Sequence, residues 1–150
     1  MRISVKRKID APSEALWNYL ADYSNISRFH PMLNGSHFTG GNTTCEVGTT
    51  RQCDMKDGNY LQEKITQWED GSHYSVQITE TSMPVKNASA TLGVRSTGEG
   101  ESEAYMDLNL EAKNPLMSPM IFLMFKYKAA PSILKGLEDL YKQEHKLAMA

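Results

Sequence analysis

Residues 60–82 read YLQEKITQWEDGSHYSVQITETS, with two strand-like runs on either side of Asp70-Gly71. An Asp-Gly pair between alternating runs is a strong signal for a β-hairpin with a two-residue turn. Such a turn pairs residues whose numbers sum to 141, and paired side chains share one face of the sheet. The predicted pairs are Leu61 with Glu80, Glu63 with Ile78, Ile65 with Val76, and Gln67 with Tyr74. One face of the hairpin therefore combines apolar side chains with Glu63.

Turn signals recur on both sides of this hairpin, at intervals typical of antiparallel strands. They occur at Gly40-Gly41-Asn42, Asp57-Gly58 and Thr97-Gly98-Glu99-Gly100. Strand-like alternation covers residues 3–9 and then about 47–55, 60–69, 72–82, 86–96 and 101–112, and a further run begins at Gly35. We therefore expect about six or seven strands, joined mostly as hairpins.

Helical patterns occupy the remaining segments. Asp10 is suited to cap a short helix that has Pro12 in its first turn and ends near Asp22, and Pro31 stops a second short helix or turn. Beyond residue 115 the apolar spacing becomes helical, and Pro131 either starts or kinks this long helix. Its inner face consists of Ile133, Leu137, Leu140, Tyr141 and Glu144.

This order of elements predicts an α+β fold, in which a curved antiparallel sheet is covered on one face by the C-terminal helix. The 150 residues fit a single domain, 1–150. A formal charge of −2 provides no positive field for nucleic acid, and no apolar run reaches the length of a membrane span. Without an N-terminal signal pattern, and with Cys45 and Cys53 outside any metal-binding spacing, we expect free thiols in the cytoplasm. No metal or cofactor is implied.

Two further hairpins extend the inner face. The turn at 97–100 pairs residues whose numbers sum to 197, which sets Leu108 opposite Ser89. At Asp57-Gly58 a two-residue and a three-residue loop are both open. The three-residue loop keeps the face more apolar and is preferred, since it places Met55, Cys53 and Arg51 beside Leu61 and Glu63. The expected inner face is Met55, Leu61, Ile65, Tyr74, Val76, Ile78, Ala104, Met106, Leu108 and Leu110, with Arg51, Glu63, Asn87, Ser89 and Thr91 among them.

So many inward polar groups point to a cavity. In a closed core each would need a hydrogen bond or cost about 1–3 kcal/mol. A largely apolar pocket with a few polar groups is typical of a small-molecule site, so we expect a cavity of about a few hundred cubic ångströms between sheet and helix. The alternative is a solvated face.

Short motifs along the chain carry a family resemblance. They are Ile9-Asp10-Ala11-Pro12, Leu16-Trp17, Ala21-Asp22, Phe29-His30-Pro31, Gly48-Thr49-Thr50-Arg51 and Leu61-Gln62-Glu63. Together they resemble the START-like SRPBCC superfamily, which includes polyketide cyclases and dehydratases, plant proteins related to the birch pollen allergen, and lipid-transfer domains. The resemblance spans essentially the whole chain and implies a helix-grip fold with a cavity between the sheet and the C-terminal helix.

The superfamily's plant hormone receptors offer the most useful comparison. Glu63 matches a cavity carboxylate there, and Val76 and Ile78 match cavity-wall positions. Pro31 stands where those receptors carry a lysine that pairs with a ligand carboxylate, so neither a hormone receptor nor an acidic ligand is implied. The ligand-binding residues that we expect are Arg51, Leu61, Glu63, Tyr74, Val76, Ile78, Asn87, Ser89, Met106, Leu108, Phe125, Ser132 and Gly136.

Two functions are the main candidates, and a partner-binding module with a vestigial cavity is a third, weaker option. The first is binding or transport of a small hydrophobic molecule, such as a lipid or a polyketide-like or aromatic metabolite. The second is a cyclase- or dehydratase-like enzyme that uses Glu63 for acid–base chemistry. Only one candidate carboxylate is present and the histidines do not cluster, so the non-catalytic role is preferred. Glu63 has a structural alternative, a buried ion pair with Arg51. Stable membrane insertion is not expected, and a homodimer is left open.

Residues 116–125, LMSPMIFLMF, are apolar nearly all the way round a helix, and Lys126 and Lys128 follow. We expect a mobile lid that continues into the C-terminal helix. Its outer side suits a transient membrane contact, or else neighbouring loops cover it.

Overall fold

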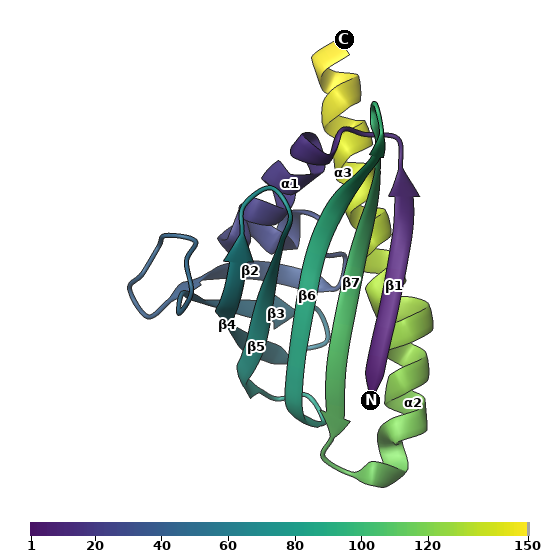
Figure 1. Ribbon diagram of the computed structural model, residues 1–150. Coiled ribbons are helices and arrows are strands. Elements are labelled where there is room, and N and C mark those ends of the chain that lie inside the picture. Colours follow the sequence, from purple (N-terminus) through teal and green to yellow (C-terminus); the bar gives the residue numbers. More distant parts are fainter. Residues whose placement is uncertain (150) are drawn as a thin grey trace.

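Seven strands form one antiparallel sheet in the order β1-β7-β6-β5-β4-β3-β2 in the computed structural model, which describes residues 1–149 (Figure 1). The strands are β1 (Arg2–Ile9), β2 (Leu33–Thr39), β3 (Thr50–Met55), β4 (Tyr60–Glu69), β5 (His73–Thr81), β6 (Val85–Gly98) and β7 (Glu101–Ala112). The turn signals of the sequence lie at the junctions of consecutive strands, with Thr97 and Gly98 as the last residues of β6, so the predicted sheet is confirmed.

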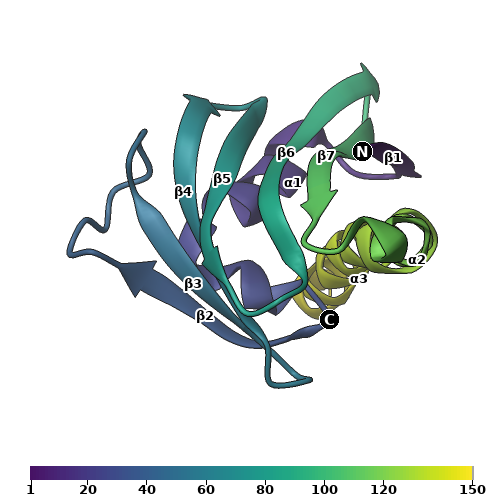
Figure 2. The ribbon, with the colours of Figure 1, turned by 90° about the horizontal axis from the view of Figure 1, so that it is seen from below.

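Helical segments cover the concave side of this sheet. They are α1 (Ser13–Ala21), the 3-10 segment η1 (Tyr23–Arg28), the short η2 (Pro115–Met117), α2 (Ser118–Met124), the π-helical η3 (Phe125–Ala129) and α3 (Ala130–Met149). Viewed from below, the sheet curves around α1, and α3 lies along its open side (Figure 2). The α+β helix-grip architecture is therefore the observed one.

Two helix boundaries refine the sequence prediction. Pro12, in an extended conformation, occupies the N-cap of α1 without a side-chain hydrogen bond, so the prediction of Asp10 as the cap is wrong. Asp10 lies two residues too early to reach the first turn. Pro131 is the second residue of α3 and follows the π-helical η3 directly, so it lies inside a continuous helical run, next to the turn where the backbone departs from α-helical geometry.

The register of β4 with β5 follows the prediction only at its centre. Glu63 pairs with Ile78 and Ile65 with Val76, as expected. Irregularities on both sides shift the outer pairs, so the predicted pairings of Leu61 with Glu80 and Gln67 with Tyr74 are wrong. The three-residue loop at 56–58 is confirmed, because Arg51 pairs with Glu63.

The register of β6 with β7 differs from the prediction by one residue. An irregularity between Ser96 and Gly98 changes the pairing, so Leu108 faces Ala90 and not Ser89. A one-residue shift moves every side chain to the other face. Asn87, Ser89 and Thr91 consequently pair with Glu111, Asn109 and Asp107 on the outer face, and Ala88, Ala90 and Leu92 take the inner one.

Trp17 anchors α1 against the sheet. It is 5% exposed, its indole N–H donates to Asp70 Oδ1 at 2.9 Å, and its ring centre lies 5.4 Å from that of Trp68.

Cys45 and Cys53 are both free thiols, as predicted. Within residues 1–149, every helix is too short or too polar to cross a bilayer.

Candidate functional site

Arg51 and Glu63 form a buried ion pair on the inner face of the sheet. The pairing of β3 with β4 sets the two residues opposite each other, and Arg51 Nη2 donates to Glu63 Oε2 at 3.1 Å. The arginine is 1% exposed and the glutamate 9%. Burial opposes the guanidinium charge, but the Glu63 carboxylate outweighs it and holds the pKa of Arg51 well above its ordinary value. Arg51 is therefore a permanent buried cation.

Aromatic residues hold the Arg51 guanidinium in place. Its Nη1 donates to the Tyr23 carbonyl at 2.9 Å and to the Tyr74 hydroxyl at 3.2 Å, and its central carbon lies 4.0 Å from the centre of the Tyr23 ring. The Arg51 Nε is buried and has no hydrogen-bond partner among the described residues. A cation–π contact and these two hydrogen bonds, together with the bond to Glu63, therefore orient the group, and one of its nitrogens, Nε, has no partner among the described residues.

The Cys53 thiol lies beside the glutamate. Its sulfur is 3.9 Å from Glu63 Oε1, and burial raises the pKa of the thiol to about 12. The thiol is therefore protonated near neutral pH, which makes it a weak donor to the carboxylate and a poor nucleophile.

A cavity of about 90 Å³ lies between the sheet and the C-terminal helical segment. The expected size of a few hundred cubic ångströms is wrong, because apolar side chains from both layers, including Met83, Met106 and Ile133, project into the space. Its lining is apolar apart from Arg51, Glu63, His30 and, at its border, Ser89.

Nine of the thirteen residues expected to bind ligand line this cavity. They are Arg51, Leu61, Glu63, Val76, Ile78, Ser89, Met106, Leu108 and Phe125. Ser89 borders it although the register places its side chain on the outer face.

The other four residues lie elsewhere for identifiable reasons. Tyr74 contacts the far side of the Arg51 guanidinium. Asn87 is on the outer face, where it donates to Glu111 at 2.7 Å. Ser132 donates to the Ala129 carbonyl at 2.7 Å within the helix. Gly136 packs against the backbone of Phe29. The structure therefore gives these four residues supporting positions outside the cavity wall.

His30 is the polar cavity residue that the sequence analysis missed. Its Nδ1 accepts the Met32 N–H at 3.3 Å, so the neutral ring carries its proton on Nε2. Burial, with a smaller contribution from Arg51, lowers the pKa of His30 to about 4. The only signal in the sequence was its place in the Phe29-His30-Pro31 motif, since no spacing pattern links it to Arg51 or Glu63.

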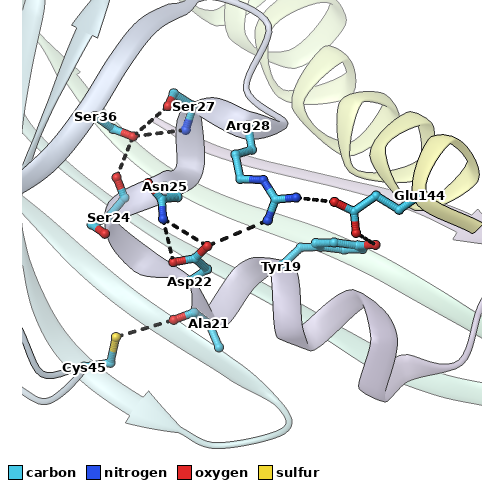
Figure 3. Close-up of polar contacts among 10 residues, drawn as sticks. All are labelled: Tyr19, Ala21, Asp22, Ser24, Asn25, Ser27, Arg28, Ser36, Cys45 and Glu144. Atoms are coloured by element: carbon cyan, nitrogen blue, oxygen red, sulfur yellow. Dashed lines mark hydrogen bonds and ion pairs between the residues drawn. The ribbon is translucent and has the colours of Figure 1, made fainter. Parts of the chain in front are cut away.

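A polar network fastens η1, which carries cavity residue Ile26 and precedes His30. Figure 3 shows Arg28 bonded to Glu144 of α3 and paired with Asp22, while Tyr19 donates to Glu144 at 2.8 Å. On the other side, Ser36 of β2 donates to the Ser24 carbonyl at 2.7 Å. The network ties η1 to both the sheet and α3, which positions one wall of the cavity.

Protonation of His30 should make the protein less stable in mild acid. The pKa is about 4 in the folded chain and 6.5 for an unperturbed histidine, so the unfolded state binds the proton more readily. The stability from the neutral ring is complete above about pH 6.5 and is lost as the pH falls toward about 4.

We expect the free energy of unfolding to fall by about 2 kcal/mol between pH 7 and pH 5. Urea unfolding at several pH values measures this loss, and His30→Gln should flatten the profile. If the wild type and His30→Gln lose stability equally as the pH falls, His30 is not the group responsible.

Comparison with known proteins agrees with the observed fold. The profile of the family described as "Polyketide cyclase / dehydrase and lipid transport" matches residues 1–142. No curated protein matches the sequence significantly.

Several solved structures share the fold. A START superfamily protein from Mycobacterium smegmatis is 14% identical, with a TM-score of 0.81 over 95% of this chain and 97% of that one. XoxI from Bacillus cereus is 18% identical, with a TM-score of 0.79 over 96% and 97% of the two chains. Ara h 8.0201 is 14% identical, with a TM-score of 0.75 over 95% and 98%. At these identities the likeness establishes the START-like fold.

Proposed function

Because the chain belongs to the polyketide cyclase/dehydrase and lipid transport family, we propose that it binds or carries a small hydrophobic molecule in the cavity between sheet and helix. The observation that carries this proposal is the cavity itself, whose apolar walls include a buried Arg51–Glu63 pair and His30. Apolar walls supply affinity, and a few fixed polar groups supply orientation.

The polar groups favour a ligand with a neutral hydrogen-bond acceptor. Arg51 Nε is a buried donor without a partner among the described residues, and neutral His30, which lines the same cavity, carries its proton on Nε2. Glu63 already balances the guanidinium charge, so the site has little excess positive charge for a carboxylate. A hydroxyl or carbonyl on an otherwise apolar lipid, polyketide-like or aromatic molecule satisfies these donors best.

The walls must move to admit such a molecule. A cavity of 90 Å³ is smaller than the roughly 150 Å³ that accommodates benzene in a protein core. Met83 and Met106 have flexible side chains that adapt readily, and Phe125 lies on the π-helical turn η3. Binding therefore expands the cavity at these residues.

The enzymatic alternative has weaker support. Glu63 would serve as the acid or base, but one of its oxygens is already bonded to Arg51. The other titratable group of the cavity, His30, has a pKa of about 4 and is a weak base. A carrier role therefore fits this site better than proton transfer. A cytoplasmic location remains a prediction from the sequence, and a homodimer remains open.

Native mass spectrometry of the purified protein tests the proposal. The expected result is an added mass that disappears on denaturation and is recovered in an organic extract of the same sample. A protein that carries no added mass, and that also fails to bind a fluorescent apolar probe such as N-phenyl-1-naphthylamine, would overturn it.

Filling the cavity should abolish binding without unfolding the protein. Ala88 lines the cavity on β6, so the added atoms of Ala88→Leu occupy the empty space. We expect probe affinity to fall at least about ten-fold, with a change in stability below about 2 kcal/mol. Asn87→Leu is the matched control, because it adds a similar side chain one residue away on the outer face. Equal affinity for both variants would show that the probe binds elsewhere.

A further inference from the structure

The exposed apolar side chains of this protein are concentrated in one short segment. Of the six large apolar residues that are exposed in the described part of the chain, five belong to residues 116–127. They are Leu116 at 88%, Met120 at 60%, Leu123 at 55%, Met124 at 42% and Tyr127 at 68% exposure. Their spacing places them along one side of the helical segment η2-α2-η3, hereafter the 116–127 stripe. Ile121 and Ala129, both 2% exposed, lie on the opposite side.

The charged residues within and beside the stripe are mostly lysines. Lys113 and Lys128 are exposed and Lys126 is half-buried, and none of the three forms an ion pair within the described residues. No aspartate or glutamate occurs from residue 112 to residue 137. The adjacent Glu111 is already paired with Lys86 at 3.0 Å. The Lys126 ammonium lies 5.4 Å from the centre of the Phe122 ring and 5.7 Å from that of Tyr127, so the cation extends along apolar surface.

We propose that the 116–127 stripe docks on the surface of a bilayer that contains anionic lipid. An exposed apolar face with leucine, methionine and tyrosine, flanked by lysines, is the pattern of a helix that lies in the membrane interface. The leucines and methionines enter the acyl boundary, while the lysines stay at the level of the negative headgroups. The segment does not span the bilayer.

The charge pattern favours a bilayer over a second copy of the chain. A two-fold contact through the stripe would press the lysines that border it against the partner's identical, lysine-bordered stripe, with no acidic residue in either segment to balance them. An anionic surface neutralises all three lysines at once.

Docking also places the cavity wall at the membrane. Phe125 lines the cavity and belongs to the same helical segment as the stripe. Figure 1 shows α2 at the end of the sheet where β1 begins. If the cavity binds an apolar molecule, as proposed above, this segment is its boundary with the lipid phase. The docking itself requires no ligand.

Co-sedimentation with lipid vesicles tests the proposal. We expect the wild-type protein to bind vesicles with about 30% phosphatidylglycerol at least ten-fold more tightly than pure phosphatidylcholine vesicles. Binding should weaken when the salt concentration rises from about 0.1 M to about 0.5 M. The double variants Leu116→Ser/Leu123→Ser and Lys126→Glu/Lys128→Glu should each lose about ten-fold or more in affinity.

The chain offers a control for each variant. Val47→Ser changes the sixth exposed apolar residue, which lies outside the stripe at 64% exposure. Lys6→Glu/Lys8→Glu reverses two exposed lysines with the same spacing on β1. Both controls should bind vesicles like the wild type, and thermal melts should show every variant folded.

Three results would overturn the proposal: no binding to the anionic vesicles, equal loss in the controls, or a dimer that only the serine variant dissociates. The third would assign the stripe to a second copy of the chain. Because the assay needs no ligand, its failure leaves the proposed ligand binding unaffected.

Discussion

Glu63→Gln is expected to lower the free energy of unfolding by about 3–5 kcal/mol, or the melting temperature by roughly 10 °C. The amide keeps the shape of the side chain but loses the charge that balances Arg51, which is 1% exposed and bonded to Glu63 at 3.1 Å. A buried cation without its counter-charge carries a large desolvation cost. Urea and thermal unfolding measure the loss.

A double variant tests the cause of this loss. Arg51→Met/Glu63→Leu removes both charges and keeps apolar bulk, so it should recover much of the stability that Glu63→Gln loses. Probe titration on Glu63→Gln then separates the two roles of the glutamate. Weaker probe binding with unchanged melting would make Glu63 a ligand contact only. Lower melting with unchanged binding would make it structural only.

Gly136→Ala is expected to destabilise the protein by at least about 3 kcal/mol. In an exposed helix this change normally adds about 1 kcal/mol of stability. Here an added Cβ would lie 1.9 Å from the carbonyl oxygen of Phe29, and backbone cannot rotate away as a side chain can. The helix α3 must therefore move away from the end of η1, which disturbs the wall that carries His30.

Gly35→Ala provides the control for this prediction. An added Cβ at Gly35 meets no atom within 4 Å, so its melting temperature should stay close to that of the wild type. If Gly136→Ala melts at or above the wild-type temperature, α3 does not need this close approach, and the assignment of Gly136 as a packing residue is wrong.

The sequence predicted turns and strand pairing correctly where a few adjacent residues decide the structure. Turn residues such as Asp57-Gly58 and Asp70-Gly71 lie between the strands that they predicted, because turn conformation depends on a few adjacent residues. The pairing of Arg51 with Glu63 followed from one loop length and from the period of two along a strand. The polar residues of β6 were predicted on the wrong face of the sheet, because no local rule decides their pairing with β7. The irregularity between Ser96 and Gly98 has no local signal, yet it moved Asn87, Ser89 and Thr91 to the other face.

The sequence by itself therefore determined the sheet, the C-terminal helix and the apolar inner face, which depend on periodicity and turn chemistry, and it offered the Arg51–Glu63 pair as one of two alternatives. Only the tertiary structure decided the size of the cavity, because that depends on how far Met83, Met106 and Ile133 project across the space between two layers. Only the tertiary structure brought His30 to Arg51 and Gly136 to Phe29, since each contact joins elements distant in the chain. Such contacts depend on how a curved sheet and a helix pack together, and no local pattern of residues encodes that distance.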